Sequence, residues 1–544
     1  MKKIYKRIAG ITKIVISECL RFRSNGDNHK AFKVFFTSLD LIINYNKLKK
    51  SFITRLVFGF LLFFVVQTIS SQSYSNNHYL PPFRHTQAGN DTAEKVVIHL
   101  TTMETSAFTV SLQKRTSSGW TSYGSYSISK TTPKIVTINC SNLGDCTYLT
   151  AMSNGTGDKY TGMKASANSP FYVNVDVLAG SQAGSYSSKG EAGLGTEFYS
   201  AHFEANAMDL GKFGDFISIL AVESGSTSIS FTKNNSNWSP SANSVTLNEG
   251  EVYILDTATQ NDSNIGTKIS ANKNIVVVSG SWSGSIGDVN SGVGRDVGVT
   301  QLLPTDKLGI DFLVHEGYSS SNKGTHAIVV AAENSTTIKV NGVTVATKNA
   351  GQHYVYDLKG KGNNLKHINT SKPAMVYYQG YPSSNSSAKN NQGLFLVAPL
   401  LDETNAPLGS SNAHFGDKVW DLEDNNTGNM AYYIMTSDPG GTTVTQNGTS
   451  VSLSGWGATS FSKTVNGVSY TMYEKTEQNA PSSDTDYYIS NSNGKPIYTI
   501  LAYSSDDRGY FVSNQAYASS NSCPEDGSLP LADMIVGIDD QIPT

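Results

Sequence analysis

The chain has 544 residues, of which 16% are charged, and its formal net charge is −3 at pH 7. This length is too great for one ordinary domain and allows several hydrophobic cores. Abundant Gly (48) and Tyr (28) with few charged residues favour extracellular β-structure over a helical enzyme. Residues 1–55 carry 13 Lys/Arg and 3 acidic residues, whereas the remainder carries 28 and 41. An acidic body without a basic stripe argues against nucleic acid as a partner.

The first predicted element is a leader over residues 1–71. Four basic residues between positions 47 and 55 precede the apolar run LVFGFLLFFVV (56–66), and small polar residues follow it. This order is typical of a secretory signal, and the run of 11 residues is shorter than a transmembrane helix needs. We therefore expect cleavage near Ser71 and a secreted or cell-surface protein. The alternative is an uncleaved leader, which would then be the chain's contact with a membrane.

The cysteines fit an exported protein. Cys140 and Cys146 bracket the segment CSNLGDC, a spacing that can close a small disulfide loop in an oxidising compartment. A two-cysteine metal site is the alternative, but no second Cys/His pair is near. Cys523 is left without a partner, so we expect the natural chain to continue past Thr544.

Strand patterns dominate the body of the chain. Alternating runs of apolar and polar residues are separated by Ser/Gly/Asn-rich segments, and we find no amphipathic helix after residue 72. The run TTIKVNGVTVAT (336–347) predicts two strands joined at Asn341-Gly342, the preferred two-residue hairpin turn. The same device recurs at Asn447-Gly448.

One order of strand, loop, glycine and strand recurs along the body. It predicts an all-β fold of four tandem antiparallel β units of about 100 residues each. A row of β-sandwich-like modules is the first choice and a propeller-like ring is the alternative, because periodicity cannot separate them. The predicted boundaries are a basic leader and signal segment (1–71), four β units (72–197, 198–297, 298–408 and 409–515) and a tail that is truncated if the chain continues (516–544).

No sequence motif for catalysis is found. The segment GSWSG (280–284) has Trp282 where a nucleophile elbow needs serine, and neither HExxH nor GxxxxGK[ST] occurs. A secreted polysaccharide-active enzyme remains an alternative, since a glycosidase needs only two carboxylates brought together, such as Asp311 and Glu316. No cofactor or metal is predicted, apart from calcium at the Asp-rich segment 421–426, which lacks the distal glutamate of a calcium loop.

Aromatic residues are the candidate ligand contacts. Aromatic rings can stack on the apolar faces of sugars, and tyrosine with Ser, Gly and Asn is a composition of adaptable binding surfaces. The alternative is core packing, which is the commoner role of strand tyrosines. The predicted binding residues are Trp282, Tyr377, Tyr378, Tyr381 and Trp420.

One segment carries a resemblance to a known family. In residues 271–314 an apolar strand ends in Ser279-Gly280 and is followed by aspartate, Gln-Leu-x-Pro, a spacer, glycine and phenylalanine. This pattern resembles the IgGFc-binding protein N-terminal domain family, as found in Bacteroidetes-type secreted and surface proteins. The resemblance extends over about residues 78–515. The matching family-motif residues are Asp296, Gln301, Pro304, Gly309 and Phe312.

The residues of this motif make sense without catalysis. Pro304 blocks continued ladder pairing, Gly309 permits a tight turn, and Asp296 and Gln301 can hydrogen-bond loop backbone. We interpret residues 294–312 as a connector between two units, with a ligand loop as the alternative. Family members often have a cysteine just before the aspartate, but Gly294-Arg295 stand there in this chain, so that disulfide is absent.

The leader, the β units, the lack of a catalytic motif and the resemblance together predict a secreted or cell-surface adhesion protein that is not an enzyme. Its expected ligand is an extracellular glycan or glycoprotein. Antibody binding does not follow from the family's name, because a shared fold does not fix a ligand. A structural spacer for a further C-terminal module is a third alternative.

Overall fold

The computed structural model is all-β, as predicted. Its regular elements are strands and short 3-10 turns, and no helix among the described residues is long and apolar enough to cross a membrane. The predicted leader and tail lie outside the described residues, all of which belong to the compact unit Ile69–Thr544. The structure describes residues 74–85, 92–140, 146–180, 182–204, 214–257, 262–284, 296–315, 325–358, 364–380, 393–400, 412–415, 428–446, 448–480, 487–505 and 510–514.

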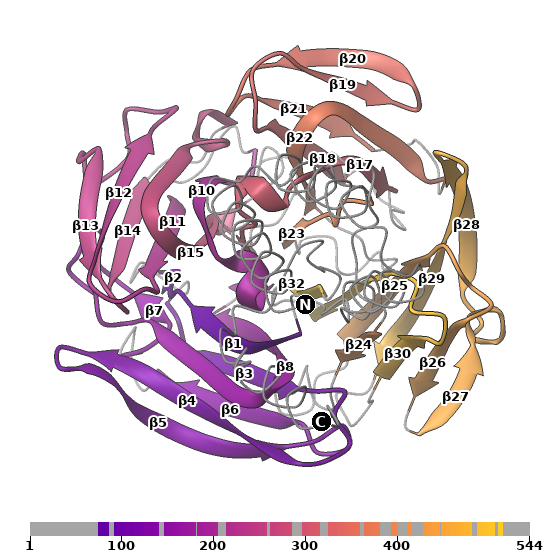
Figure 1. Cartoon of the computed structure of the whole chain (residues 1–544), viewed down its shortest axis with the longest axis horizontal. Coiled ribbons are helices and arrows are strands. Elements are labelled where there is room, and N and C mark those ends of the chain that lie inside the picture. The colour runs from indigo at the N-terminus through magenta and orange to yellow at the C-terminus, as the bar shows by residue number, and fades with distance from the viewer. Residues whose placement is uncertain are drawn as a thin grey trace, which may run out of the picture. The chain divides into compact units, whose positions relative to one another are not determined.

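The strands form four successive groups, which we call modules 1 to 4 (Figure 1). Module 1 holds β1 (Ser75–Leu80), β2 (Phe83–Arg84), β3 (Lys95–Thr101), β4 (Phe108–Thr116), β5 (Gly119–Ile128), β6 (Lys134–Asn139), β7 (Thr150–Ala151), β8 (Met163–Ala179) and β9 (Gln182–Ser187). Module 2 holds β10 (Gly195–Tyr199), β11 (Gly214–Ala221), β12 (Ser226–Thr232), β13 (Ser244–Asn248), β14 (Val252–Thr257), β15 (Lys268–Gly284) and β16 (Asp296–Gln301).

The other two modules repeat this order. Module 3 holds β17 (Gly309–Val314), β18 (His326–Ala331), β19 (Thr336–Val340), β20 (Val343–Lys348), β21 (His353–Asp357), β22 (Lys366–Gly380) and β23 (Gly393–Leu396). Module 4 holds β24 (Asn412–Phe415), β25 (Gly428–Thr436), β26 (Thr442–Gln446), β27 (Thr449–Ser452), β28 (Thr459–Val465), β29 (Val468–Ala480), β30 (Tyr487–Asn491), β31 (Ile497–Ser505) and β32 (Tyr510–Asn514). The predicted boundary between residues 297 and 298 falls inside β16, which pairs with β15.

Each module is built around one long strand that belongs to two half-sheets. In module 2 the first half of β15 pairs with β10 and β12, and the second half pairs with β11 and β16. The strands β13 and β14 extend the two halves. We call β13-β12-β15-β10 the outer half-sheet and β14-β11-β15-β16 the inner half-sheet. In module 4 the long strand is divided into β30 and β31, so the two halves are separate sheets.

The sequence of β15 explains this division. Its first part, KISANKN (268–274), alternates small or polar residues with apolar ones, as expected for a strand with one face in water. Its second part, IVVV (275–278), is continuously apolar and fully buried, as expected for a strand covered on both faces. The outer half-sheet therefore meets solvent, and the inner one does not.

Both faces of the central strands of the inner half-sheets, such as β3, β11 and β18, are covered because neighbouring modules share their hydrophobic cores. Successive residues of β25 show this: Tyr432 and Ile434 pack in the core of module 4, whereas Tyr433 and Met435 pack against module 3. In β3, Val96 and Ile98 close the core of module 1, and Val97 packs with module 4. From module 2, the residues that complete the core of module 1 are Phe216, Val278, Trp282, Val297 and Val299.

The innermost strands close the modules into a ring. Contacts join β9 to β16, β16 to β23, β23 to β32 and β32 to β9 (Figure 1). Glycine permits this approach at Gly184, where an added Cβ would lie 2.0 Å from the carbonyl oxygen of Val297. The modules therefore form the propeller-like ring of the alternative prediction and not the predicted row of β-sandwich-like modules.

The predicted hairpin in module 3 is confirmed. Asn341 and Gly342 have φ angles of 49° and 83° between β19 and β20, which is the pair of positive φ values that a type I′ turn requires. The strands β26 and β27 also pair as a hairpin, although Asn447 lies outside the described residues.

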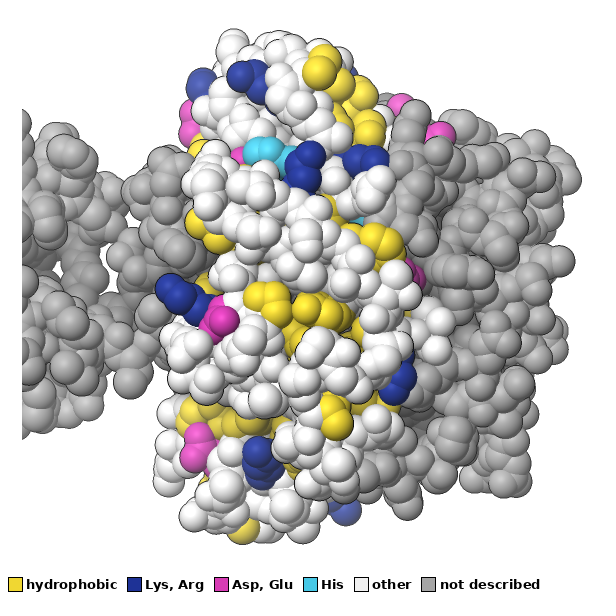
Figure 2. All heavy atoms as spheres, turned by 90° about the vertical axis from the view of Figure 1, so that its right-hand side faces the viewer, with side chains coloured by type: hydrophobic (Ala, Val, Ile, Leu, Met, Phe, Trp, Pro, Cys, Tyr) yellow, Lys and Arg dark blue, Asp and Glu magenta, His cyan; other side chains and the backbone are white. Residues whose placement is uncertain are grey.

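The outer faces of the outer half-sheets carry few charges. On β12 every second residue is exposed, and these residues are all Ser or Thr. Figure 2 shows the side of the molecule that carries β26 to β29, where neutral polar side chains and backbone predominate over scattered charged groups. The exterior is therefore rich in neutral hydrogen-bonding groups.

Truncating Trp282 tests the shared core of modules 1 and 2. Because its side chain is 1% exposed, Trp282→Ala should lower the free energy of unfolding by about 3–5 kcal/mol. Urea unfolding measures this loss. Hydrogen exchange of the variant should show that the backbone amides of β3 and β11 lose protection at the same urea concentration. Ser125→Ala, on the exposed face of β5, should change stability by less than about 0.5 kcal/mol. Loss of protection in module 2 alone would contradict a shared core.

A methyl group at Gly184 tests the ring closure. The nearest atom to the added Cβ is a backbone oxygen that cannot rotate away, so Gly184→Ala should destabilise the protein by about 1–3 kcal/mol. Gly440→Ala is the matched control, because the nearest atom to its added Cβ is Asp438 Oδ1 at 3.9 Å. Thermal melting of both variants measures the difference, and equal melting temperatures would refute the close approach.

Candidate functional site

The aromatic residues predicted to contact ligand are core residues. Trp282 is 1% exposed, Tyr377 0% and Tyr378 4%. The hydroxyl of Tyr377 donates to the carbonyl of His202 at 2.8 Å, and that of Tyr378 accepts from the amide of His315 at 2.9 Å. Since all three lie on inner half-sheets with both faces covered, they present no ring face to a sugar. This corrects their assignment as ligand contacts.

Two further predicted residues, Tyr381 and Trp420, lie outside the described residues. The predicted disulfide is confirmed: Cys140 and Cys146 are bonded to each other at the end of β6. This bond closes the segment between two buried positions, and the residues that it encloses lie outside the described ranges.

The family motif forms a connector that ties modules 1, 2 and 3 together. The side-chain amide of Gln301 donates to the carbonyl of Tyr79 at 3.2 Å, and its carbonyl oxygen accepts from the amide of Lys189. Pro304 packs directly on Gly195, where an added Cβ would lie 2.2 Å from the proline ring. The predicted hydrogen bonds from Gln301 to backbone are therefore present.

The remaining motif residues are also structural. Asp296 begins β16 and is fully buried, and Phe312 is 1% exposed in β17. Gly309 opens β17 opposite Ala374 of β22. Residues 296–312 thus run from the last strand of module 2 to the first strand of module 3, which supports the connector interpretation.

Carboxylates inside the modules are held by histidine and asparagine side chains. Asp176 lies 2.7 Å from Nε2 of His99 and is fully buried; burial raises its pKa despite this contact. Burial also tends to raise the pKa of Asp311, but hydrogen bonds from His367, Asn369 and Asn466 outweigh it and hold this pKa below 3.8. Each carboxylate is surrounded by hydrogen-bond partners from its own neighbourhood, as expected for a carboxylate with a structural role in a buried polar network.

The catalytic and calcium alternatives involve residues outside the described ranges. Glu316, the predicted partner of Asp311, lies outside them, as does the Asp-rich segment 421–426. Among the residues that are described, no group of three or more His, Cys, Asp or Glu side chains could hold a metal ion.

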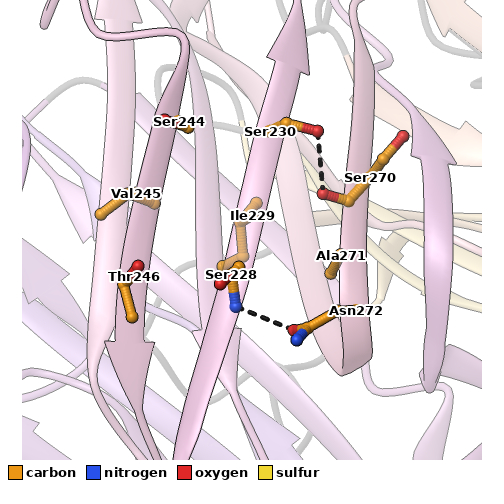
Figure 3. A pocket seen from close by; sticks show the side chains of 9 residues that line it. All are labelled: Ser228, Ile229, Ser230, Ser244, Val245, Thr246, Ser270, Ala271 and Asn272. Carbon is orange, nitrogen blue, oxygen red and sulfur yellow. Dashed lines mark hydrogen bonds between the residues drawn. The ribbon is translucent and has the colours of Figure 1, made fainter.

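An open groove of about 560 Å³ lies on the outer half-sheet of module 2 (Figure 3). This volume falls within the range of about 300–1,000 Å³ typical of ligand sites. The groove is hollowed because the outward side chains of β12, β13 and β15 are short. Its lining residues are Ser228, Ile229, Ser230, Ser244, Val245, Thr246, Ser270, Ala271 and Asn272.

The strand register arranges the polar side chains of the groove in two rows. Ser230 lies between Ser244 on β13 and Ser270 on β15, which forms the first row. The second row places Ser228 between Thr246 and Asn272 in the same register. Neighbours within a row are about 4.8 Å apart, and the rows are about 7 Å apart along the strands.

The groove is chemically neutral. None of its lining residues is charged or aromatic. Beside the first row, Glu197 of β10 stands opposite Ser270 and forms an ion pair with Lys268 at 2.6 Å, so this border carries no net charge. The arrangement can therefore exchange hydrogen bonds with a neutral polar ligand but has no group that would attract an ion.

The groove was not predicted from the sequence. The available signal was the alternation of Ser with apolar residues in β12. The signal was incomplete because the rows depend on the register between β12, β13 and β15, which are distant in sequence.

Comparisons with known proteins give one family match. The sequence profile of a family described as IgGFc binding protein matches residues 185–488, more than half of the chain. No curated protein matches the chain.

Among solved structures, a lectin from Pleurotus ostreatus in complex with GalNAc is 14% identical, covers 39% of this chain and 76% of its own, and has a TM-score of 0.12. An anti-sigma factor domain-containing protein from Clostridium clariflavum is 9% identical, covers 76% and 99%, and also has a TM-score of 0.12. At these TM-scores the alignments carry no argument about fold or ligand.

Buried histidines predict acid sensitivity. Burial lowers the pKa of His78, His202 and His315 from 6.5 to about 4. The unfolded chain takes up these protons below pH 6.5 and the folded chain does not, so stability should fall progressively between pH 6.5 and 4. At pH 4.5 the loss should be about 2.5 kcal/mol per histidine.

Urea unfolding at pH 7.5, 5.5 and 4.5 measures this dependence. His202→Gln should reduce the difference in unfolding free energy between pH 7.5 and 4.5, whereas Ser125→Ala should leave it unchanged. An undiminished difference in His202→Gln would show that His202 is not held neutral by burial.

Proposed function

This chain belongs to the IgGFc binding protein family, and on that basis we propose that it is a secreted or cell-surface binding protein. It holds an extracellular glycan or glycoprotein without transforming it, and so acts in adhesion. The family match carries the proposal, because the family is a binding family and not an enzyme family. The matched residues, 185–488, span modules 2 and 3 and most of module 4.

Features of the chain support an extracellular setting. The basic leader with its short apolar run is typical of export, and the bond between Cys140 and Cys146 is typical of an oxidising compartment. The low charged fraction of 16% agrees with this setting.

The ring itself is suited to binding. Shared cores make the scaffold rigid, and a rigid β-scaffold can present a ligand surface without losing much conformational entropy on binding. The exposed faces offer neutral hydroxyl and amide groups, which exchange hydrogen bonds with the neutral polar groups of glycans and glycoproteins.

An array of glycans and glycoproteins, including an immunoglobulin Fc fragment, tests this function with the full chain. We expect selective retention on some spots and no released products, while the heat-denatured chain is not retained. Released sugars would replace the proposal with a polysaccharide-active enzyme. If the chain is retained on no spot, the proposal of a binding protein is replaced by that of a structural spacer.

A further inference from the structure

We propose that the groove on module 2 binds a neutral glycan, which lies across β13, β12 and β15 along the two rows of polar side chains. The inference rests on the proposed binding function and names its ligand class and its site. The rows are Ser244-Ser230-Ser270 and Thr246-Ser228-Asn272 (Figure 3).

The first argument is that the hydroxyl groups of the groove are available, although Oδ1 of Asn272 already accepts from the backbone amide of Ser228 at 2.8 Å. Within the part of the chain that the structure describes, the hydroxyls of Ser228, Ser244 and Thr246 have no protein partner. The hydroxyl of Ser230 lies 3.5 Å from the carbonyl of Ser270, at the limit of a hydrogen bond. These side chains are exposed or half-buried, so a ligand can reach them.

The second argument is that the chemistry of the groove excludes other ligands. An anionic polysaccharide or phosphate group needs Arg or Lys, and the lining has neither. An extended peptide adds to an unpaired strand edge or fills apolar pockets. Here β12 is paired on both sides, and Ile229 is turned into the core. The strand β13 is the edge of the sheet, so a peptide added to it would lie beside the groove and leave the two polar rows unoccupied.

The third argument is geometric. Each row crosses three strands, so it presents hydroxyl or amide groups at about 4.8 Å intervals over about 10 Å. A glycan carries hydroxyl groups on every sugar residue, each of which can donate and accept. A chain of sugars can therefore meet successive members of a row, whereas a single sugar reaches only part of it. The site is expected to prefer an oligosaccharide over its monomer.

Modules 3 and 4 differ from this groove at the equivalent positions. Module 4 has the equivalent row Ser452-Thr443-Ser490, but the hydroxyls of Thr443 and Ser490 lie 3.3 Å apart and bond to each other. In module 3 the central position is Lys339, which adds a charge. Module 1 has the row Ser125-Ser111-Ser166, which makes it the source of a matched control.

The experiment compares two double variants of the full chain. S228V/S230V removes the central hydroxyl of each row, and T109V/S111V makes the same kind of change on β4 of module 1. Valine is favourable in strands, and thermal melting confirms that both variants fold. The probes are the neutral hexasaccharides maltohexaose and cellohexaose, glucose, and a hexamer of galacturonate as the charged comparator. Calorimetric titration gives affinities, and hydrogen exchange locates the contact.

We expect the wild type and T109V/S111V to bind a neutral hexasaccharide more tightly than glucose or the charged hexamer. S228V/S230V should weaken this binding by about tenfold or more, because hydrogen bonds in both rows are lost. Binding should slow hydrogen exchange in residues 226–232, 244–248 and 268–272.

The proposal would be overturned by no binding of either neutral hexasaccharide by the wild type, by unchanged affinity in S228V/S230V, or by protection elsewhere in the chain. Equal weakening in T109V/S111V would also overturn it, because module 2 would then not be the site. If the wild type is still retained on array spots, the proposed binding function stands and only the groove assignment fails. If no spot retains it, both fail.

Discussion

The structure depends on one constraint: each module leaves a hydrophobic face that only its neighbour can cover. Alternate residues of a single inner strand, such as Tyr432 and Tyr433, serve two different cores. A row of such modules would leave apolar faces exposed at its two ends, at a cost of about 25 cal/mol for each Å². Closing the four modules into a ring removes both ends, and this is why the inner strands meet in a circuit.

The same constraint determines where ligands can bind. The central strands of the inner half-sheets are covered on both faces, so the large aromatic side chains that they carry stabilise the ring instead of contacting a ligand. Outer half-sheets have one free face, and in module 2 that face carries short hydroxyl and amide side chains around an open groove. The two halves of β15 have different roles. The continuously apolar half packs inside the ring, and the alternating half contributes polar side chains to the exposed groove.

The sequence predicted much of the fold but little of the site. Alternation, the Asn341-Gly342 turn and the recurring unit were sufficient to predict strands, a hairpin and four β units, because these signals are local. The burial of Tyr377 and Tyr378 was missed because adjacent strand residues point to opposite faces, and only the ring shows that both faces are covered. The rows around Ser228 and Ser230 were missed because register between distant strands leaves no local signal.

Scanning calorimetry of the full chain tests the shared-core account most directly. If the four modules share their cores, the ring unfolds as one cooperative unit, and the calorimetric enthalpy of its transition should be close to the van't Hoff enthalpy. If the modules were independent, the calorimetric enthalpy would exceed the van't Hoff value about fourfold, as for four separate domains. The second result would contradict the central claim that each module is completed by its neighbour.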